Sequence, residues 1–122
     1  MLDASQMKNL LFPDMDVEKM EFFPHEKSLK VFVDGAVPDV EDGILLGRGI
    51  LFFSAWESLS IRKFDAATET WSDLNELTAE YLRDLCEVEF LDSSVSLCGF
   101  SKQSDQWLEW KIARAQMHAE FE

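Results

Sequence analysis

The residues that most catalytic and metal sites depend on are scarce in this sequence. Its 122 residues include two Cys, two His and one Tyr. Two cysteines and two distant histidines do not supply the ligand spacing of a zinc site. No apolar segment approaches the roughly 18–20 residues that span a bilayer. The N-terminal stretch MLDASQMKNLL lacks the basic region and the cleavage site of a signal peptide. We therefore expect a cytoplasmic protein without a metal or a cofactor.

Positive charge is also scarce. There are 11 Lys or Arg against 24 Asp or Glu, and the formal net charge is −13. Nucleic acids and anionic membranes repel such a chain, so neither is an expected partner. A basic protein is the expected partner, because the field of the chain would steer it inward. The simpler alternative is that the acidity only keeps the protein in solution.

No combination of nucleophile and base can be recognised. His25 and His118 have no nucleophile beside them, and Ser54 and Ser58 lack the Gly-x-Ser-x-Gly pattern of an exposed nucleophile. The carboxylates Asp14, Asp16 and Glu18 are close in sequence, which does not place two acids across a cleft. The chain is therefore predicted not to be an enzyme.

The cysteines belong to a predicted hairpin. Its two strands cover residues 86–92 and 94–101. When Val88 lies opposite Leu97, Cys86 and Cys98 fall on different faces and cannot form a disulfide. We expect free, inert thiols in a reducing compartment.

The densest apolar stretch covers residues 43–65, GILLGRGILFFSAWESLSIRKFD. Its Ile and Phe content favours a strand, and each glycine inside the run would cost a helix about 1 kcal/mol. We predict a central strand over 43–56, bent or bulged at Gly47 and Gly49. Residues 57–65 alternate between apolar and polar and predict a neighbouring strand.

The other elements follow from periodicity. Strands are predicted over 17–23 and 28–33, joined as a hairpin. A helix is predicted from Asp73, which caps it with Glu76 three residues later. Its apolar stripe consists of Leu74, Leu77, Tyr81, Leu82 and Leu85. Residues 107–122 fit a helix or two strands with a turn near Ala113, and we favour strands because the preceding hairpin leaves an edge to pair.

Together these elements predict one domain over residues 1–122. Its class is α+β: a strongly bent, mainly antiparallel sheet, open or partly closed into a barrel, with one covering helix. Trp56 and Trp110 are expected in its core.

Two groups of residues are candidate contacts for a partner. The first is the acidic loop of residues 34–42, with Asp34, Asp39, Glu41 and Asp42. Its spacing does not match the calcium-binding EF-hand, so its carboxylates are predicted to meet Lys or Arg of a protein. The second group is Trp71 and Trp107, which follow polar stretches and are predicted interface anchors. The alternative is that each tryptophan packs over its own strand.

Three segments carry a resemblance to known families. They are Phe12-Pro13-Asp14-Met15-Asp16-Val17-Glu18-Lys19-Met20, Gly49-x-Leu51-x-Phe53-x-x-Trp56-x-x-Leu59-x-Ile61-Arg62, and Gly99-Phe100 with Trp107-x-Glu109 and Phe121-Glu122. They resemble small, uncharacterised bacterial domain families, some of which are associated with polymorphic-toxin systems as immunity proteins. Pro13 stands where those families usually have His, and no catalytic or binding residue carries over. The resemblance implies an immunity- or antitoxin-like inhibitor of a basic toxin.

Two other functions remain open at this point. A small-ligand-binding or enzymatic domain would use a pocket inside the bent sheet, lined by Phe52, Phe53, Trp56, Phe100 and Trp110. A homo-oligomeric structural protein would join copies through exposed strand edges, so the expected state is a monomer or a small homo-oligomer.

Overall fold

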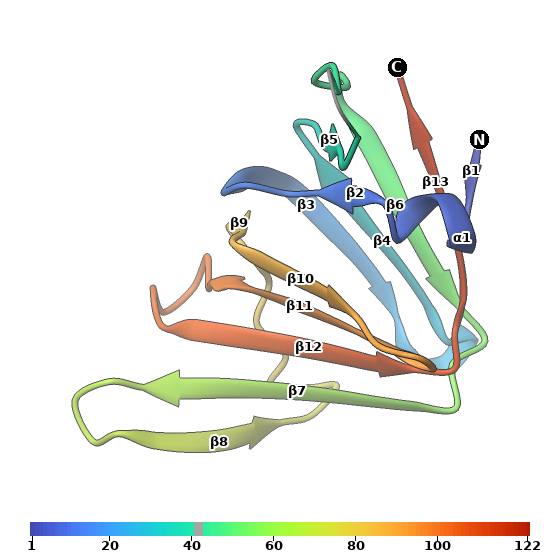
Figure 1. Cartoon of the computed structure of the whole chain (residues 1–122). Helices are drawn as coiled ribbons and strands as arrows, with labels where there is room; N and C mark the ends of the chain where they lie inside the picture. Colours follow the sequence, from blue (N-terminus) through green and yellow to red (C-terminus); the bar gives the residue numbers. More distant parts are fainter. Residues whose placement is uncertain (41–42) are drawn as a thin grey trace.

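The fold consists of two antiparallel sheets that meet at one corner and diverge from it (Figure 1). The computed structural model describes residues 1–40 and 43–122. The strands of the first sheet are β1 (Leu2–Asp3), β3 (Met15–Phe23), β4 (Ser28–Val33), β6 (Gly49–Ser54), β9 (Asp84–Leu85) and β13 (Gln116–Phe121). Those of the second are β7 (Ser58–Asp65), β8 (Thr70–Leu74), β10 (Glu87–Phe90), β11 (Ser94–Phe100) and β12 (Trp107–Ala113). The remaining elements are β2 (Leu10–Leu11), β5 (Val37–Pro38), the helix α1 (Ala4–Met7) and the 3-10 turn η1 (Pro24–Glu26).

The strand orders show how the chain is shared between the sheets. The six-stranded sheet has the order β1-β13-β6-β4-β3-β9, and the five-stranded sheet has the order β10-β11-β12-β7-β8. β2 and β5 form a separate pair. The described strands do not close into a barrel, so the predicted mainly antiparallel architecture is confirmed and the barrel form is not.

The chain passes between the sheets twice at the shared corner. β6 leads into β7 through Ala55, and β12 leads into β13 through Arg114. Both residues have a positive φ, which is 52° for Ala55 and 55° for Arg114. The corner is held together where the Glu57 amide donates to the Ala113 carbonyl at 2.9 Å. A turn was predicted near Ala113, and the prediction of two strands over 107–122 is confirmed.

The stretch 43–65 is divided differently from its prediction. β6 begins only at Gly49, whereas Ile44 is 80% exposed, so the predicted strand over 43–56 is too long. β7 is a strand as predicted, but it lies in the other sheet and does not pair with β6. No bulge is found at Gly49, because β6 pairs in continuous register with β4 and β13 from this residue on. A Cβ there would lie 2.3 Å from the Phe121 ring, so the glycine makes room for that ring.

The core fills the space between the two sheets. Strands with one buried face alternate in sequence, as in β4 and β6, because successive side chains point to opposite faces. The largest side chains with less than 2% exposure are Trp110, Phe53, Met7, Leu29, Leu51, Leu82, Leu85, Leu97, Leu108, Ile112, Val31 and Val33. Trp56 is also buried, so both tryptophans expected in the core are found there.

The helix predicted from Asp73 is wrong. The chain forms β8, a turn and an extended segment that contains β9, and Leu77 of the expected apolar stripe is 95% exposed. The extended segment pairs with both sheets: the Arg83 amide donates to the Phe100 carbonyl at 2.7 Å, and the Val17 amide donates to the Arg83 carbonyl at 2.9 Å. The edges of β3 and β11 gain these hydrogen bonds, and this pairing overrides the local helical pattern.

The predicted hairpins are confirmed. β3 pairs with β4, with a register shift near Val17 that accounts for its imperfect alternation. β10 pairs with β11 in the predicted register, with Val88 opposite Leu97. Cys86 and Cys98 are free, as expected.

Replacing Gly99 with alanine is expected to lower the free energy of unfolding by about 2–3 kcal/mol, because there is no room for a side chain. A Cβ at Gly99 would lie 2.0 Å from the carbonyl oxygen of Asp84 in β9, and that backbone cannot retreat without loosening β9 from its partners. Urea denaturation measures the change. Gly47→Ala is the control, since its Cβ would meet nothing closer than 3.6 Å. Equal losses in the two variants would show that the contact with β9 is not the cause.

Candidate binding surface

Four aromatic residues form one row across the outer face of the five-stranded sheet. Phe100 in β11, Trp107 in β12, Phe64 in β7 and Trp71 in β8 each lie directly opposite the next. Neighbouring strands are about 4.8 Å apart, so the row extends over roughly 14 Å. The row lies on the outer face because Leu108, the next residue after Trp107, points into the core.

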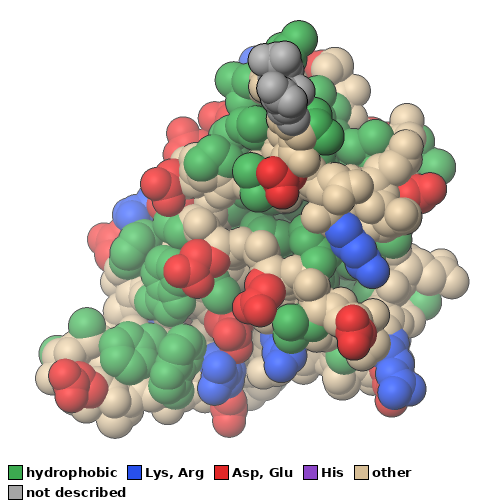
Figure 2. All heavy atoms as spheres, viewed as in Figure 1, with side chains coloured by type: hydrophobic (Ala, Val, Ile, Leu, Met, Phe, Trp, Pro, Cys, Tyr) green, Lys and Arg blue, Asp and Glu red, His purple; other side chains and the backbone are tan. Residues whose placement is uncertain are grey.

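The two rings at the ends of the row are exposed to solvent. Trp71 is 44% exposed and Phe100 is 38% exposed. The rings of Phe64 and Trp71 lie 5.2 Å apart, as do those of Phe100 and Trp107. Figure 2 shows hydrophobic side chains gathered at the lower left, over the ends of β7 and β8, with charged side chains beside them. Contiguous exposed apolar side chains with a charged rim are typical of protein interaction sites.

The two cations at this row are already paired with carboxylates. The Arg62 guanidinium lies 4.4 Å above the Trp71 ring and donates to Glu109 from Nε at 3.1 Å and from Nη2 at 2.8 Å. Arg83 lies 5.6 Å from the Phe100 ring centre and forms an ion pair with Asp105. Each guanidinium group therefore stacks on an aromatic ring while a carboxylate balances its charge. Neither group adds an unpaired positive charge to the row.

The row of residues beside the aromatic row is acidic. It contains Glu87, Cys98, Glu109, Arg62 and Asp73 in adjacent strands. Three carboxylates therefore face one guanidinium. Glu87 and Asp73 are exposed at the two ends of this row. A partner that covers the aromatic rings meets negative charge along one side of them.

The sequence predicted the two tryptophans of this surface but not its two phenylalanines. Phe64 and Phe100 alternate with inward-facing residues at the ends of their strands, and this periodicity could have marked both as outward-facing. The pairing of four strands in one register, which brings the rings together, could not be inferred from the pattern alone.

The predicted acidic loop does not join this surface. Asp34 and Asp39 are exposed beside β5, at the top of Figure 1, whereas β8 lies at the bottom. Glu41 and Asp42 lie outside the described residues. The structure thus brings Trp71 and Trp107 together and leaves the described carboxylates of the loop at the other end of the molecule.

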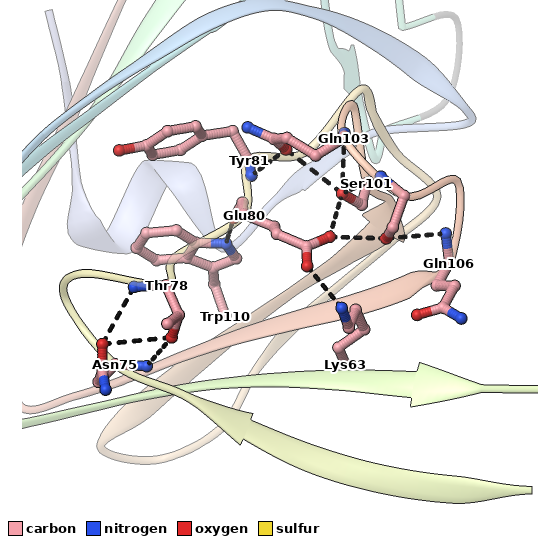
Figure 3. Close-up of polar contacts among 10 residues, drawn as sticks. Lys63, Asn75, Thr78, Glu80, Tyr81, Ser101, Gln103, Gln106 and Trp110 are labelled. Carbon is pink, nitrogen blue, oxygen red and sulfur yellow. Dashed lines mark hydrogen bonds and ion pairs between the residues drawn. The ribbon is translucent and has the colours of Figure 1, made fainter.

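A second cluster of polar groups surrounds Glu80, inside the opening between the sheets (Figure 3). The Glu80 carboxylate accepts hydrogen bonds from Lys63 Nζ at 2.7 Å, Ser101 Oγ at 2.7 Å and Ser104 Oγ at 2.6 Å. The Glu80 carbonyl accepts a hydrogen bond from Trp110 Nε1 at 3.0 Å. Burial raises the pKa of Glu80, but the hydrogen bonds from Lys63, Ser104 and Ser101 outweigh it and lower the pKa below its usual 4.5.

The Glu80 cluster combines a serine, a lysine and a carboxylate, yet its geometry indicates a structural role. Ser101 is fully buried, so no substrate can approach its hydroxyl oxygen. The Ser101 hydroxyl donates to Glu80 and accepts from backbone amides, among them that of Gln103 at 3.1 Å. Lys63 donates to the same carboxylate and is not free to act as a base. The cluster fastens the extended segment before β9 to the five-stranded sheet.

Both cysteine thiols are expected to react slowly in the folded protein. Burial and the Asp84 carboxylate raise the pKa of Cys86 to about 12, and burial and the Glu109 carboxylate raise the pKa of Cys98 to about 11. The pKa of an ordinary cysteine thiol is 9.0, so the reactive thiolate of either residue is at least ~100-fold rarer at neutral pH. Alkylation by iodoacetamide, followed by mass spectrometry, should label neither cysteine quickly in buffer and both in urea. Rapid labelling without urea would contradict this expectation.

The residues predicted to line an internal pocket do not converge on one cavity. Phe53, Trp56 and Trp110 are buried in the core. Phe52 stacks on His118 on the outer face of the six-stranded sheet, with ring centres 4.3 Å apart. Phe100 belongs to the aromatic row on the other sheet.

The chain was compared with protein-family models, with curated proteins and with solved structures. None of the three comparisons found a match. Over the described part of the chain, no helix combines the length and the apolar character needed to cross a membrane.

Proposed function

We propose that this protein binds another protein, and that the aromatic row of Phe100, Trp107, Phe64 and Trp71 is the centre of the contact. The observation that carries the proposal is the direct opposition of four aromatic residues on an exposed sheet face. Tryptophan and other aromatic side chains supply much of the binding energy of protein interfaces, because they bury a large area at a small cost in side-chain entropy.

Electrostatics support a basic partner. The net charge of −13 attracts positively charged proteins over a distance, and the row beside the aromatic row carries Glu87, Glu109 and Asp73. A partner with apolar side chains surrounded by Lys or Arg therefore complements this surface in both respects. The partner that we propose is a basic toxin, with this chain as its immunity- or antitoxin-like inhibitor. Enzymes that cleave nucleic acids are often basic because they bind phosphates.

The test compares the wild-type protein with the double variant Trp71→Ala/Trp107→Ala. Both are immobilised and exposed to a lysate of the native host at low and at high salt. A protein retained by the wild type is then purified whether or not the variant also retains it, and its affinity for both forms and its effect on growth when expressed alone are measured. We expect a basic protein whose binding weakens at least ~30-fold in the double variant and falls with salt.

Asp34→Ala/Asp39→Ala is the matched control, because it removes two carboxylates of the acidic loop at the other end of the molecule. A partner that binds the tryptophan variant as tightly as the wild type would refute the proposed surface. Loss of binding in the control variant alone would move the contact to the acidic loop.

A further inference from the structure

The aromatic row ends at an unpaired strand edge. β8 is the last strand of the five-stranded sheet, and no strand lies beyond it in Figure 1. Its five residues, TWSDL, contain no proline, and four of them are exposed. Within the described residues, the backbone of β8 hydrogen-bonds only to β7. Such an edge presents free amide and carbonyl groups to any extended chain that approaches it.

We propose that β8 binds an extended basic segment of the partner protein as a sixth strand of this sheet. The inference rests on the proposed function, since it states how the partner of the aromatic row is held. Addition of a strand supplies main-chain hydrogen bonds for affinity, and the side chains on the two faces of the edge supply specificity. The two faces of β8 differ, and each specifies a kind of residue in the added segment.

On the outer face, the added strand continues two existing rows. Its residue beside Trp71 extends the aromatic row, where an apolar or guanidinium group stacks on the exposed ring. Its residue beside Asp73 extends the acidic row. Asp73 forms no ion pair within the described part of the chain, so a lysine or arginine at that position gains a carboxylate partner. These two positions are two residues apart, because alternate residues share a face.

On the inner face, the edge of β8 borders a groove. Leu74 lines this groove of about 370 Å³ together with Leu59 and Ile61 of β7. Trp56 and Phe22 form part of its floor. An apolar side chain beside Leu74 would therefore leave water and enter the groove. The added segment is thus expected to combine a basic residue facing Asp73 with an adjacent apolar residue facing Leu74.

A second copy of this chain fits the edge less well than a basic partner. Each copy carries a net charge of −13, so two copies repel one another as they approach. The β8 strand itself contains no Lys or Arg to place beside Asp73. Charge complementarity therefore favours a foreign basic segment.

The experiment uses the full chain and a blocked nine-residue peptide in which valine alternates with arginine. A second peptide carries N-methyl groups on alternate residues, which removes backbone donors and keeps the side chains and the charge. We expect the first peptide to bind at least ~10-fold more tightly than the second, because strand addition depends on main-chain hydrogen bonds. We also expect it to slow hydrogen exchange of amides in residues 70–74, as measured by NMR.

Protein variants test the register. Asp73→Lys is expected to weaken the binding of the first peptide by at least ~10-fold through charge repulsion. Asp92→Lys is the matched control, because it makes the same change of charge in the exposed turn between β10 and β11, at the far end of β11 from the aromatic row. Equal weakening in both variants would mean that the peptide responds only to net charge, and would overturn the proposed register.

The remaining outcomes separate this inference from the proposed function. Equal binding of the two peptides, with a loss of affinity in Trp71→Ala, would overturn strand addition and leave docking on the aromatic face standing. Failure of both peptides to bind would overturn the inference, while the capture experiment would still decide the function. Protection of the amides of residues 70–74 from hydrogen exchange could instead rise with protein concentration in the absence of peptide. That result would identify a second copy of this chain as the occupant of the edge and would overturn the proposal of a foreign segment.

Discussion

Trp110→Ala is expected to lower the free energy of unfolding by about 3–5 kcal/mol, which is a large share of the stability of a small domain. Trp110 is fully buried between the sheets. Its ring meets Phe22 of the opposite sheet edge-on, with ring centres 5.0 Å apart, and its Nε1 donates to the Glu80 carbonyl. The substitution opens a cavity and leaves that carbonyl without its partner, and urea denaturation measures the loss.

The control for Trp110 lies on the same strand. Trp107 belongs to β12 as well, but it points outward into the aromatic row and packs against Phe100. Trp107→Ala is expected to cost about 1 kcal/mol, the contribution of one aromatic pair at a surface. A similar loss in both variants would contradict the assignment of the inner face to the core. A loss of this size would also show that Trp107→Ala, one half of the double variant used to test binding, remains folded.

Glu80→Gln is expected to reduce the free energy of unfolding by about 2–3 kcal/mol at neutral pH. The Glu80 side chain is 13% exposed, and the Lys63 side chain with which it forms an ion pair is 24% exposed. The glutamine leaves the ammonium group of Lys63 without a counter-charge in a partly buried place. Glu76→Gln is the control, because Glu76 is exposed nearby on the same connection between β8 and β9.

The effect of Glu80→Gln should depend on pH. Because the pKa of Glu80 is lower in the folded protein than its usual 4.5, the unfolded chain takes up the proton first as the pH falls. The stabilisation from the charged Glu80 is therefore complete well above pH 4.5, and it is lost as the pH falls through the folded pKa. The difference in stability between wild type and Glu80→Gln should shrink in acid. A difference that stays constant between neutral and acidic pH would exclude the ion pair as its cause.

The segment before β9 shows why one prediction about the fold was wrong. Leu74, Leu82 and Leu85 have helical spacing, and local propensity agrees with it. In the structure, Leu74 ends β8, whereas Leu82 and Leu85 lie in the extended segment that hydrogen-bonds to β3 and β11. The hydrogen bonds that decide the structure join residues far apart in sequence, so they cannot be predicted from a local pattern.

The candidate surface was predictable only in part, for a similar reason. Trp71 and Trp107 were recognised as large aromatic residues next to polar stretches, while Phe64 and Phe100 were not. Each of the four side chains is ordinary within its own strand. They become a surface because β11, β12, β7 and β8 pair in a register that aligns them.

The sequence by itself determined the mainly antiparallel architecture, the two hairpins and the separation of the two cysteines. These features depend on alternation along one strand and on short turns, which are local. The tertiary structure alone decided which strands share a sheet, where the chain crosses the corner, and that the segment before β9 is extended. It also decided that the aromatic row ends at the free edge of β8. These features depend on contacts between distant residues, whose hydrogen bonds and buried area outweigh local preference.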